Sequence, residues 1–152
     1  MKMLMPTSPG GHLKQVVLLA EKLKKDFDIT FITYYTPLAE KLLKGYKVEF
    51  VIEPKIGIKS WPRKFVLAMQ AALLLLKERS SVIVTAGSDV AVPFCYIGKL
   101  LGKKIIFIES WSRVRKPSKS GKLVYPIANL FFVQWEDLKS EYPRAVYAGR
   151  LL

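Results

Sequence analysis

Met3-Leu4-Met5 and Gly10-Gly11-His12 open the chain with a short apolar run and a turn that contains two glycines. The residues that follow place apolar side chains at helical spacing, at Leu13, Val16, Val17, Ala20 and Leu23. We therefore predict a strand that turns through the glycines directly into a helix. Such a turn brings backbone amide groups and the positive end of the helix dipole to one point, where anions bind.

The turn also carries His12, which is the only histidine of the chain. A helix N-terminus favours the neutral imidazole, which is the form that accepts a proton. His12 is therefore a candidate base, and Gly10 and Gly11 are candidates for holding a phosphate group. A tight turn with a surface histidine explains the same tripeptide, and the tripeptide alone does not decide between the two interpretations.

Composition limits the classes of protein and partner. The chain has 152 residues, 51% of them hydrophobic, which predicts one domain over residues 1–152. Its 25 basic and 12 acidic residues give a net charge of +13, which favours polyanions, anionic lipid surfaces or phosphorylated ligands as partners. Cys95 is the only cysteine, so we expect no disulfide, a reducing compartment and a small buried thiol.

Membrane and export signals are weak. Only three apolar residues separate Met1-Lys2 from Pro6, too few for a signal peptide, so we expect the protein to stay in the cytoplasm. The longest candidate span, Phe65 to Leu76, has Gln70 as its only polar residue. It is shorter than the roughly 20 residues that a spanning helix needs. We expect no unaided crossing of a bilayer.

Short apolar runs alternate with segments of helical periodicity along the whole chain. We predict strands at Lys2-Met5, Ile29-Thr33, Val48-Ile52, Val82-Thr85, Lys104-Ile108, Leu130-Val133 and Val146-Ala148, and helices near 12–25, 36–44, 62–79, 91–101 and 121–128. Strands that are apolar on both faces are typical of a parallel sheet covered on both sides. The predicted fold is α/β, a Rossmann-like parallel sheet with helices on both faces.

Ligands of such sheets bind beyond the carboxyl ends of the strands, so the residues that follow each strand are candidates for a site. The loops after four predicted strands meet at one edge and predict a crevice lined by Gly11, His12, Gly87, Glu109, Arg113 and Gln134. Gly87 permits a sharp turn, and Ser88 or Asp89 can cap the helix that follows.

The stretch from Lys99 to Lys122 holds eight basic residues and one acidic residue, Glu109. Its loop residues Arg113, Arg115 and Lys116 are candidates for closing on a diphosphate, and a solvated basic face is the alternative. Glu109 either packs against Arg113 or a backbone amide, or takes part in the chemistry because it follows a strand.

The apolar segment between Lys59 and Arg79 has Trp61 at its start and basic residues at both ends. This pattern fits a helix lying in the plane of a membrane, with contacts from Trp61, Arg63, Lys64 and Phe65. A buried crossover helix gives the same apolar pattern. Both interpretations stay open, and both hold if part of the helix lies in the core.

Several chemistries do not fit. One histidine, one cysteine and scattered carboxylates do not make a typical zinc site, and no Walker lysine motif is present, so we expect neither metal nor cofactor. Charge alone favours nucleic acid, and the aromatic residues lie mostly within apolar runs, so we expect no nucleic-acid partner.

The order of motifs resembles a known family. Gly10-Gly11-His12 is followed by Thr85-x-Gly87 with Pro93, Ile108-Glu109-Ser110 with Arg113, Gly121-Lys122, Gln134-Trp135 and Tyr147-Ala148-Gly149-Arg150-Leu151. This order resembles the membrane-associated subunit of split GT-B-type glycosyltransferases. These include the eukaryotic subunit that helps add the second N-acetylglucosamine to the dolichol diphosphate carrier, and bacterial relatives in polysaccharide biosynthesis.

The resemblance implies the N-terminal, acceptor-side half of a GT-B fold, with the donor-binding half on a separate polypeptide. The pair would transfer N-acetylglucosamine or a related sugar from a UDP-sugar to a lipid-diphosphate acceptor, at the cytoplasmic face of a membrane. The resemblance makes His12 and Glu109 the candidate catalytic residues. Acceptor or phosphate contacts are expected from Gly10, Gly11, Gly87, Ser88, Arg113, Arg115, Lys116 and Gln134.

The sequence departs from the pattern of the eukaryotic family members in its means of membrane attachment. Eukaryotic members carry an N-terminal transmembrane helix that this sequence does not show, so attachment is expected from Trp61 to Leu76, from basic residues or from a partner. Half a cleft is expected to be inactive alone. Two alternatives remain, a non-catalytic membrane scaffold and a free-standing nucleotide or nucleic-acid binder.

Overall fold

A computed structural model describes residues 1–54 and 61–151. The strands are β1 (Lys2–Pro6), β2 (Asp28–Thr33), β3 (Lys47–Phe50), β4 (Val82–Thr85), β5 (Lys104–Ile108), β6 (Leu130–Val133) and β7 (Val146–Tyr147). The helices are α1 (Gly11–Leu23), α2 (Pro37–Leu42), α3 (Trp61–Glu78), α4 (Ala91–Leu100), α5 (Lys119–Val124) and the 3₁₀ helix η2 (Glu136–Ser140). Every predicted strand is present, with ends that agree within two residues.

Helix α5 differs most from its prediction, because it begins and ends earlier. The Ser118 hydroxyl accepts a hydrogen bond from the Gly121 amide at 2.8 Å and so caps a helix that starts at Lys119. Pro126, which has no amide donor, follows its last turn. The 3₁₀ helix η2 was not predicted.

The seven strands are parallel and lie in the order β3-β2-β1-β4-β5-β6-β7. Chain order reverses between β1 and β4, where Met3 pairs with Val82 on one side and with Ile29 on the other. The carboxyl ends of β1 and β4 therefore form the switch point at which such sheets bind ligands.

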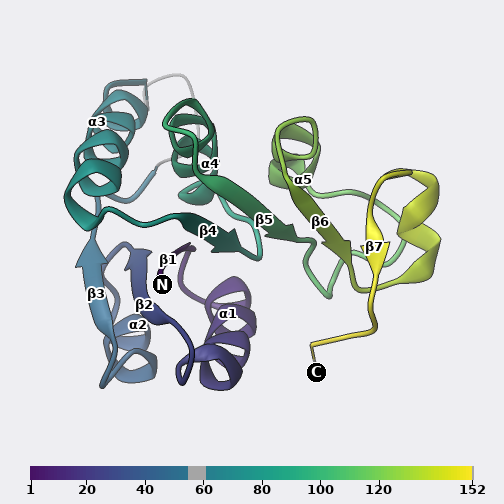
Figure 1. The fold of residues 1–152 in the computed structure, drawn as a ribbon, viewed down its shortest axis with the longest axis horizontal. Helices are drawn as coiled ribbons and strands as arrows, with labels where there is room; N and C mark the ends of the chain where they lie inside the picture. Colours follow the sequence, from purple (N-terminus) through teal and green to yellow (C-terminus); the bar gives the residue numbers. More distant parts are fainter. Residues whose placement is uncertain (55–60, 152) are drawn as a thin grey trace.

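Helices cover both faces of this sheet, as predicted (Figure 1). Alternate residues of β1 show the division, because Met3 and Met5 join the core under α1 and α2 while Leu4 joins the core under α3, α4 and α5. The Rossmann-like α/β fold is thus confirmed.

Helix α3 is apolar on two faces. Leu67, Ala71 and Leu75 are buried in the core. Trp61 at the start of the helix and Leu73 in its second half are 74% and 63% exposed. One face of the helix therefore belongs to the core, as the second interpretation expected, and the membrane contact of the exposed face stays a prediction. Among the described residues, no helix combines the length and the apolarity that crossing a membrane requires.

Candidate functional site

A cavity of about 850 Å³ opens at the carboxyl ends of the strands, beside the switch point. Loops after β1, β2, β3, β4 and β5 and the start of α5 form its wall. Its lining residues are Ser8, His12, Tyr34, Glu53, Pro54, Ser88, Asp89, Ser112, Arg113, Lys116, Pro117, Ser118, Lys119 and Ser120. The predicted edge of the sheet is thus the edge that holds a cavity.

His12 lies in this wall in a defined orientation. Its Nδ1 atom is 2.9 Å from the carbonyl oxygen of Ala86, just beyond the end of β4. Because a carbonyl only accepts, this hydrogen bond requires a proton on Nδ1. In the neutral ring Nε2 then carries the free lone pair, so the contact with Ala86 selects the tautomer that serves as a base at Nε2.

Gly10 and Gly11 precede His12 at the start of α1. Gly10 has a φ of 102°, in the region that favours glycine, and it gives α1 no side-chain cap. The amide groups of the first turn therefore lack partners within the helix. Ser8 and His12, on either side of the glycines, line the cavity.

The turn after β4 holds two consecutive residues with positive φ. Gly87 has a φ of 89°, and a Cβ at this position would lie 2.9 Å from the Ser120 hydroxyl, so Gly87 lets β4 and α5 approach closely. Ser88 has a φ of 137°, which a non-glycine residue adopts only under strain, and it lines the cavity. Gly87 itself does not line the cavity, and its part in the site is to shape the turn.

Some side chains of the basic loop line the cavity, and others extend into the solvent. Arg113 and Lys116 line the cavity, as does Lys119 at the start of α5. Arg115, which the sequence placed with them, has a side chain that is 84% exposed and lies 3.6 Å from Asp137. The loop turns and bends between Trp111 and Lys116, and Arg115 does not join its neighbours in the cavity.

Glu109, the other predicted catalytic residue, lies in the interior beside the cavity rather than in its wall. It is fully buried, and its carboxylate accepts hydrogen bonds from the Ser110 amide at 2.8 Å and from the Ser118 amide and hydroxyl at 3.1 and 3.0 Å. The Tyr142 hydroxyl donates a fourth at 2.9 Å. Glu109 does not line the cavity, and its contacts join the two ends of the basic loop.

Tyr142 supports this arrangement electrostatically. Burial, with the nearby Glu109 carboxylate adding to it, strongly raises the pKa of Tyr142. The phenol therefore stays protonated and remains a donor to Glu109.

Gln134 is also buried and is part of an amide network. Its Nε2 donates to Gln15 Oε1 at 2.8 Å and to the Glu109 carbonyl at 3.0 Å, and its Oε1 accepts from the Leu151 amide. Gln15 in turn accepts from the Trp111 amide at 3.1 Å. Gln134 thus links α1, the loop after β5 and the C-terminal segment, and it does not line the cavity.

The sequence interpretation missed part of the cavity. Tyr34 follows β2 and Glu53 follows β3, so the rule that found His12 and Arg113 would have found both. Asp89 was considered only as a helix cap, yet it lines the cavity. Burial and the charges of Glu53 and Asp89 raise the pKa of Tyr34, which keeps it a neutral donor beside two carboxylates.

The residues predicted to contact a membrane lie in the first two turns of α3. Trp61 and Phe65 are exposed. Arg63 is half-buried and its guanidinium lies 3.5 Å from the Glu53 carbonyl oxygen. Lys64 is exposed and lines a second, apolar groove between α3 and α4.

Solved structures share the fold. MurG from Acinetobacter baumannii matches 90% of this chain with a TM-score of 0.77 at 14% identity, over 42% of its own length. MnaA from S. aureus, solved with UDP, matches 99% of the chain with a TM-score of 0.75 at 11% identity, over 45% of its own length. At these identities the likeness concerns the fold alone.

Comparison with proteins of similar sequence points to a specific family. The protein named UDP-N-acetylglucosamine transferase subunit ALG14 is 44% identical over 101 residues in Candida albicans, which is 62% of this chain and 46% of that protein. The human protein of that name is 33% identical over 103 residues, 61% of this chain and 48% of that protein. The Yarrowia lipolytica protein is 32% identical over 146 residues, 92% of this chain and 62% of that protein.

The matches to the Candida albicans and human proteins span about half the length of those relatives. The family model described as "Oligosaccharide biosynthesis protein Alg14 like" matches residues 56–151, which is well over half of the chain. Fold, motif order and these matches agree, and this chain belongs to the Alg14-like family of oligosaccharide biosynthesis proteins.

Proposed function

We propose that this chain is the acceptor-binding half of a two-chain enzyme that transfers N-acetylglucosamine from a UDP-sugar to a lipid-diphosphate-linked acceptor. The observation that carries the proposal is His12, whose Nδ1 is held by the Ala86 carbonyl and whose ring lines a cavity with Arg113 and Lys116. A base and two cations in one cavity suit an acceptor that has both a hydroxyl group and a diphosphate. The relatives named as subunits of such a transferase support it.

In the proposed reaction, the acceptor hydroxyl gives its proton to Nε2 of His12 as its oxygen forms a bond to the anomeric carbon of the donor sugar. The bond from that carbon to the diphosphate oxygen breaks, and UDP leaves with the electron pair. Arg113 and Lys116 hold the acceptor diphosphate, which fixes the hydroxyl near His12. Glu109 acts indirectly, by joining the ends of the loop that carries both cations.

The donor sugar and its UDP group require a second surface. We propose that a separate donor-binding chain supplies it and that this chain alone does not catalyse transfer. The cavity is open to solvent on this chain. Relatives named as transferase subunits agree with such a division.

Membrane attachment is proposed through α3. Trp61, Phe65 and Leu73 give the helix an exposed apolar face, and Lys64 adds a positive charge at its start. Exposed apolar residues beside basic ones are typical of helices that lie in a membrane interface. The net charge of +13 favours an anionic leaflet, and the unpaired, buried Cys95 agrees with the cytoplasmic face.

The test is a transfer assay on the purified pair and on each chain alone. This chain is co-expressed with the donor-binding subunit, and transfer from UDP-N-acetylglucosamine to an N-acetylglucosaminyl diphosphate lipid is measured. His12→Ala should lower kcat by about 100-fold without loss of the partner, because a positioned base contributes that much or more. Lys14→Ala, an exposed residue of the same helix outside the cavity, is the matched control.

The results of these experiments separate the proposed function from its alternatives. Unchanged turnover in His12→Ala would remove His12 from the chemistry, and full activity of this chain alone would refute the two-chain proposal. Recruitment of the partner that does not depend on His12 or Glu109 would favour the non-catalytic scaffold. Tight, salt-dependent binding of nucleic acid by the isolated chain would favour the free-standing binder.

A further inference from the structure

The contact that holds His12 belongs to a longer chain of hydrogen bonds around the end of β4. His12 Nδ1 donates to the carbonyl oxygen of Ala86 at 2.9 Å. That carbonyl and the amide of Gly87 are the two polar ends of one planar peptide group. The Gly87 amide donates to the Thr85 hydroxyl oxygen at 3.1 Å, and the Thr85 hydroxyl donates to the carbonyl oxygen of Pro6 at 2.7 Å. The chain thus runs from His12 to β1 with every donor pointing the same way.

The orientation of this peptide group decides which nitrogen of His12 is free. Gly87 has a φ of 89°, and because glycine adopts both positive and negative φ, the peptide before it can point either way. Turned over, the peptide would present its N–H to His12 in place of the carbonyl. Nδ1 would then accept a hydrogen bond, the proton of the neutral ring would lie on Nε2, and Nε2 could not serve as a base.

The Thr85 hydroxyl favours the observed orientation. Thr85 is fully buried, and it uses its only hydroxyl proton on the Pro6 carbonyl oxygen. What the hydroxyl oxygen offers to the peptide is therefore a lone pair, which the Gly87 N–H can use and a carbonyl cannot. Hydrogen bonds in such a chain also polarise one another, which makes the Ala86 carbonyl a stronger acceptor for His12.

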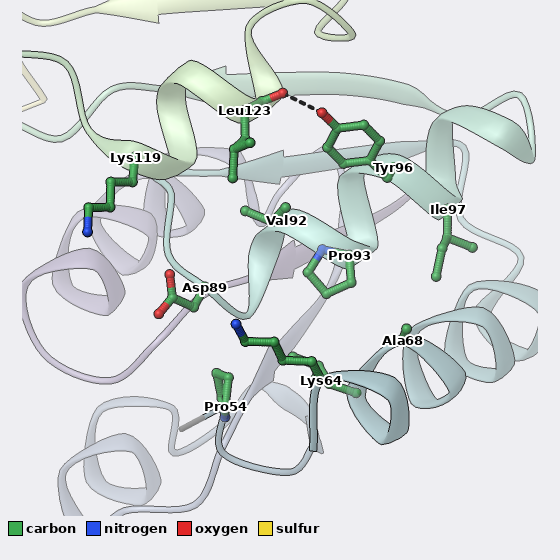
Figure 2. Close-up of a pocket in the computed structure, with 11 residues that line it drawn as sticks. Pro54, Lys64, Ala68, Asp89, Val92, Pro93, Tyr96, Ile97, Lys119 and Leu123 are labelled. Carbon is green, nitrogen blue, oxygen red and sulfur yellow. Dashed lines mark hydrogen bonds between the residues drawn. The ribbon is translucent and has the colours of Figure 1, made fainter. Parts of the chain in front are cut away.

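The segments on both sides of this peptide are packed. Thr85 is the last residue of β4 and pairs with Phe107 of β5. After the turn the chain enters α4, where Val92 and Pro93 line the apolar groove beside α3 (Figure 2). Loss of the Thr85 hydroxyl should therefore alter the turn rather than the sheet or the helix.

We propose that Thr85 is a positioning residue for the proposed base. Its hydroxyl holds the peptide between Ala86 and Gly87 so that His12 keeps its proton on Nδ1 and its lone pair on Nε2. In the Ser-His-Asp triad a carboxylate behind the ring has this task, and here a peptide group oriented by a hydroxyl takes its place. Thr85 is buried and does not line the cavity, so it acts only through His12. The inference rests on the proposed function for its effect on catalysis, whereas the tautomer is measured without any transfer.

The test determines the tautomer of His12 by NMR spectroscopy. Because His12 is the only histidine, ¹⁵N-labelled histidine gives the signals of a single ring. Spectra are recorded at alkaline pH, where neutral histidine rings predominate. In the wild-type chain Nδ1 should carry the proton. In Thr85→Val, which removes the hydroxyl and keeps the shape, the ratio of the Nδ1–H to the Nε2–H tautomer should fall about 10-fold, the effect of one ordinary hydrogen bond.

Two further variants separate the hydroxyl from a change in packing. Thr85→Ser keeps a hydroxyl and should restore the wild-type tautomer. Thr33→Val is the matched control, because Thr33 is the last residue of β2 and is equally buried. Its hydroxyl has no hydrogen-bond partner within residues 1–54 and 61–151, so this variant should leave the tautomer unchanged. Circular dichroism checks that each variant is folded.

A transfer assay with the donor-binding subunit connects the tautomer to catalysis. Thr85→Val should lower kcat about 10-fold and leave the KM for the acceptor unchanged, since it alters the base and not the binding groups. Thr85→Ser should restore kcat. A changed tautomer with an unchanged kcat would contradict His12 as the base, which belongs to the proposed function.

Other outcomes concern the inference itself. A tautomer that changes in Thr85→Val alone would support it. Equal tautomer ratios in the wild-type chain and Thr85→Val, or equal effects of Thr85→Val and Thr85→Ser, would overturn it. A proton on Nε2 of His12 in the wild-type chain would also overturn it, and this measurement needs no variant.

Discussion

The hydrogen bond from Tyr142 to Glu109 can be removed with little other change. Tyr142→Phe deletes the hydroxyl that donates to Glu109 Oε2 at 2.9 Å and keeps the ring. The ring packs against Phe131 at 4.5 Å and Tyr125 at 4.9 Å between centroids, so the aromatic cluster should persist. The variant therefore tests the polar contact rather than the packing.

The expected loss follows from the partners that remain. A hydrogen bond to a charged group contributes about 1.5–3 kcal/mol, and Glu109 would keep three donors, from Ser110 and Ser118. We therefore expect the lower part of that range, a decrease of about 2 kcal/mol in the free energy of unfolding. For a chain of this length this corresponds to a fall in Tm of about 4–8 °C.

Urea unfolding followed by circular dichroism measures this loss. Tyr147→Phe is the control, because Tyr147 is 44% exposed and its hydroxyl makes no hydrogen bond among the described residues. If Tyr142→Phe lost less than about 0.5 kcal/mol, the range of ordinary surface substitutions, the buried carboxylate would not depend on this donor. The view of Glu109 as the residue that fixes the basic loop would then be refuted.

Three further predictions concern a buried glycine, a half-buried tyrosine and a buried cysteine. Gly121→Ala should destabilise the fold by about 1–3 kcal/mol in urea unfolding, because its Cβ would meet Glu109 Oε2 and lie 2.6 Å from Tyr142 Oη. Helix propensity alone predicts the opposite sign, so a stabilised variant would refute the packing argument. Burial, with the Glu21 carboxylate, raises the pKa of Tyr46 to about 12, so unfolding releases its proton and stability should fall above pH about 10. Tyr46→Phe should flatten this decline when unfolding is measured at several alkaline pH values, and an unchanged slope would exclude Tyr46. Burial raises the pKa of Cys95 to about 12, so a thiol reagent should label it only at the rate of unfolding, and immediate labelling of the native protein would contradict its burial.

Much of the fold was predictable because its strands are short apolar runs between polar turns. The bounds of β4, β5 and β6 agree with the prediction because each strand has a neighbour on both sides in the sheet and is mostly apolar. The start of α5 was not predictable from periodicity, because it depends on the Ser118 hydroxyl capping the Gly121 amide. Such a cap is visible only when the direction of the preceding loop is known.

The position of the cavity was predictable from the sequence, but only some of the residues that line it were. His12, Ser88 and Arg113 line the cavity because each follows a strand whose carboxyl end lies at the same edge. Glu109 and Gln134 follow strands too, yet both turn into the interior. Beyond the last paired residue a strand no longer fixes the direction of its side chains, so the sequence could not separate these cases.

Helix α3 shows why its segment supported two interpretations. Periodicity separates a buried face from a polar one, but here the residues opposite Leu67 and Leu75 include exposed Phe65 and Leu73. A single apolar face would have been sufficient for the core. Within residues 1–54 and 61–151 the second face is exposed, which is the physical reason for proposing that it contacts a membrane surface.

The position of His12 depends on two strands that are distant in sequence and adjacent in the sheet. The Thr85 hydroxyl donates to the Pro6 carbonyl oxygen at 2.7 Å and so joins the ends of β4 and β1. The next residue, Ala86, provides the carbonyl oxygen that holds His12 Nδ1. The tautomer of the proposed base is therefore fixed by the same switch point that opens the cavity, and the crossover between β1 and β4 determines both where the cavity lies and which nitrogen of His12 is free to take a proton.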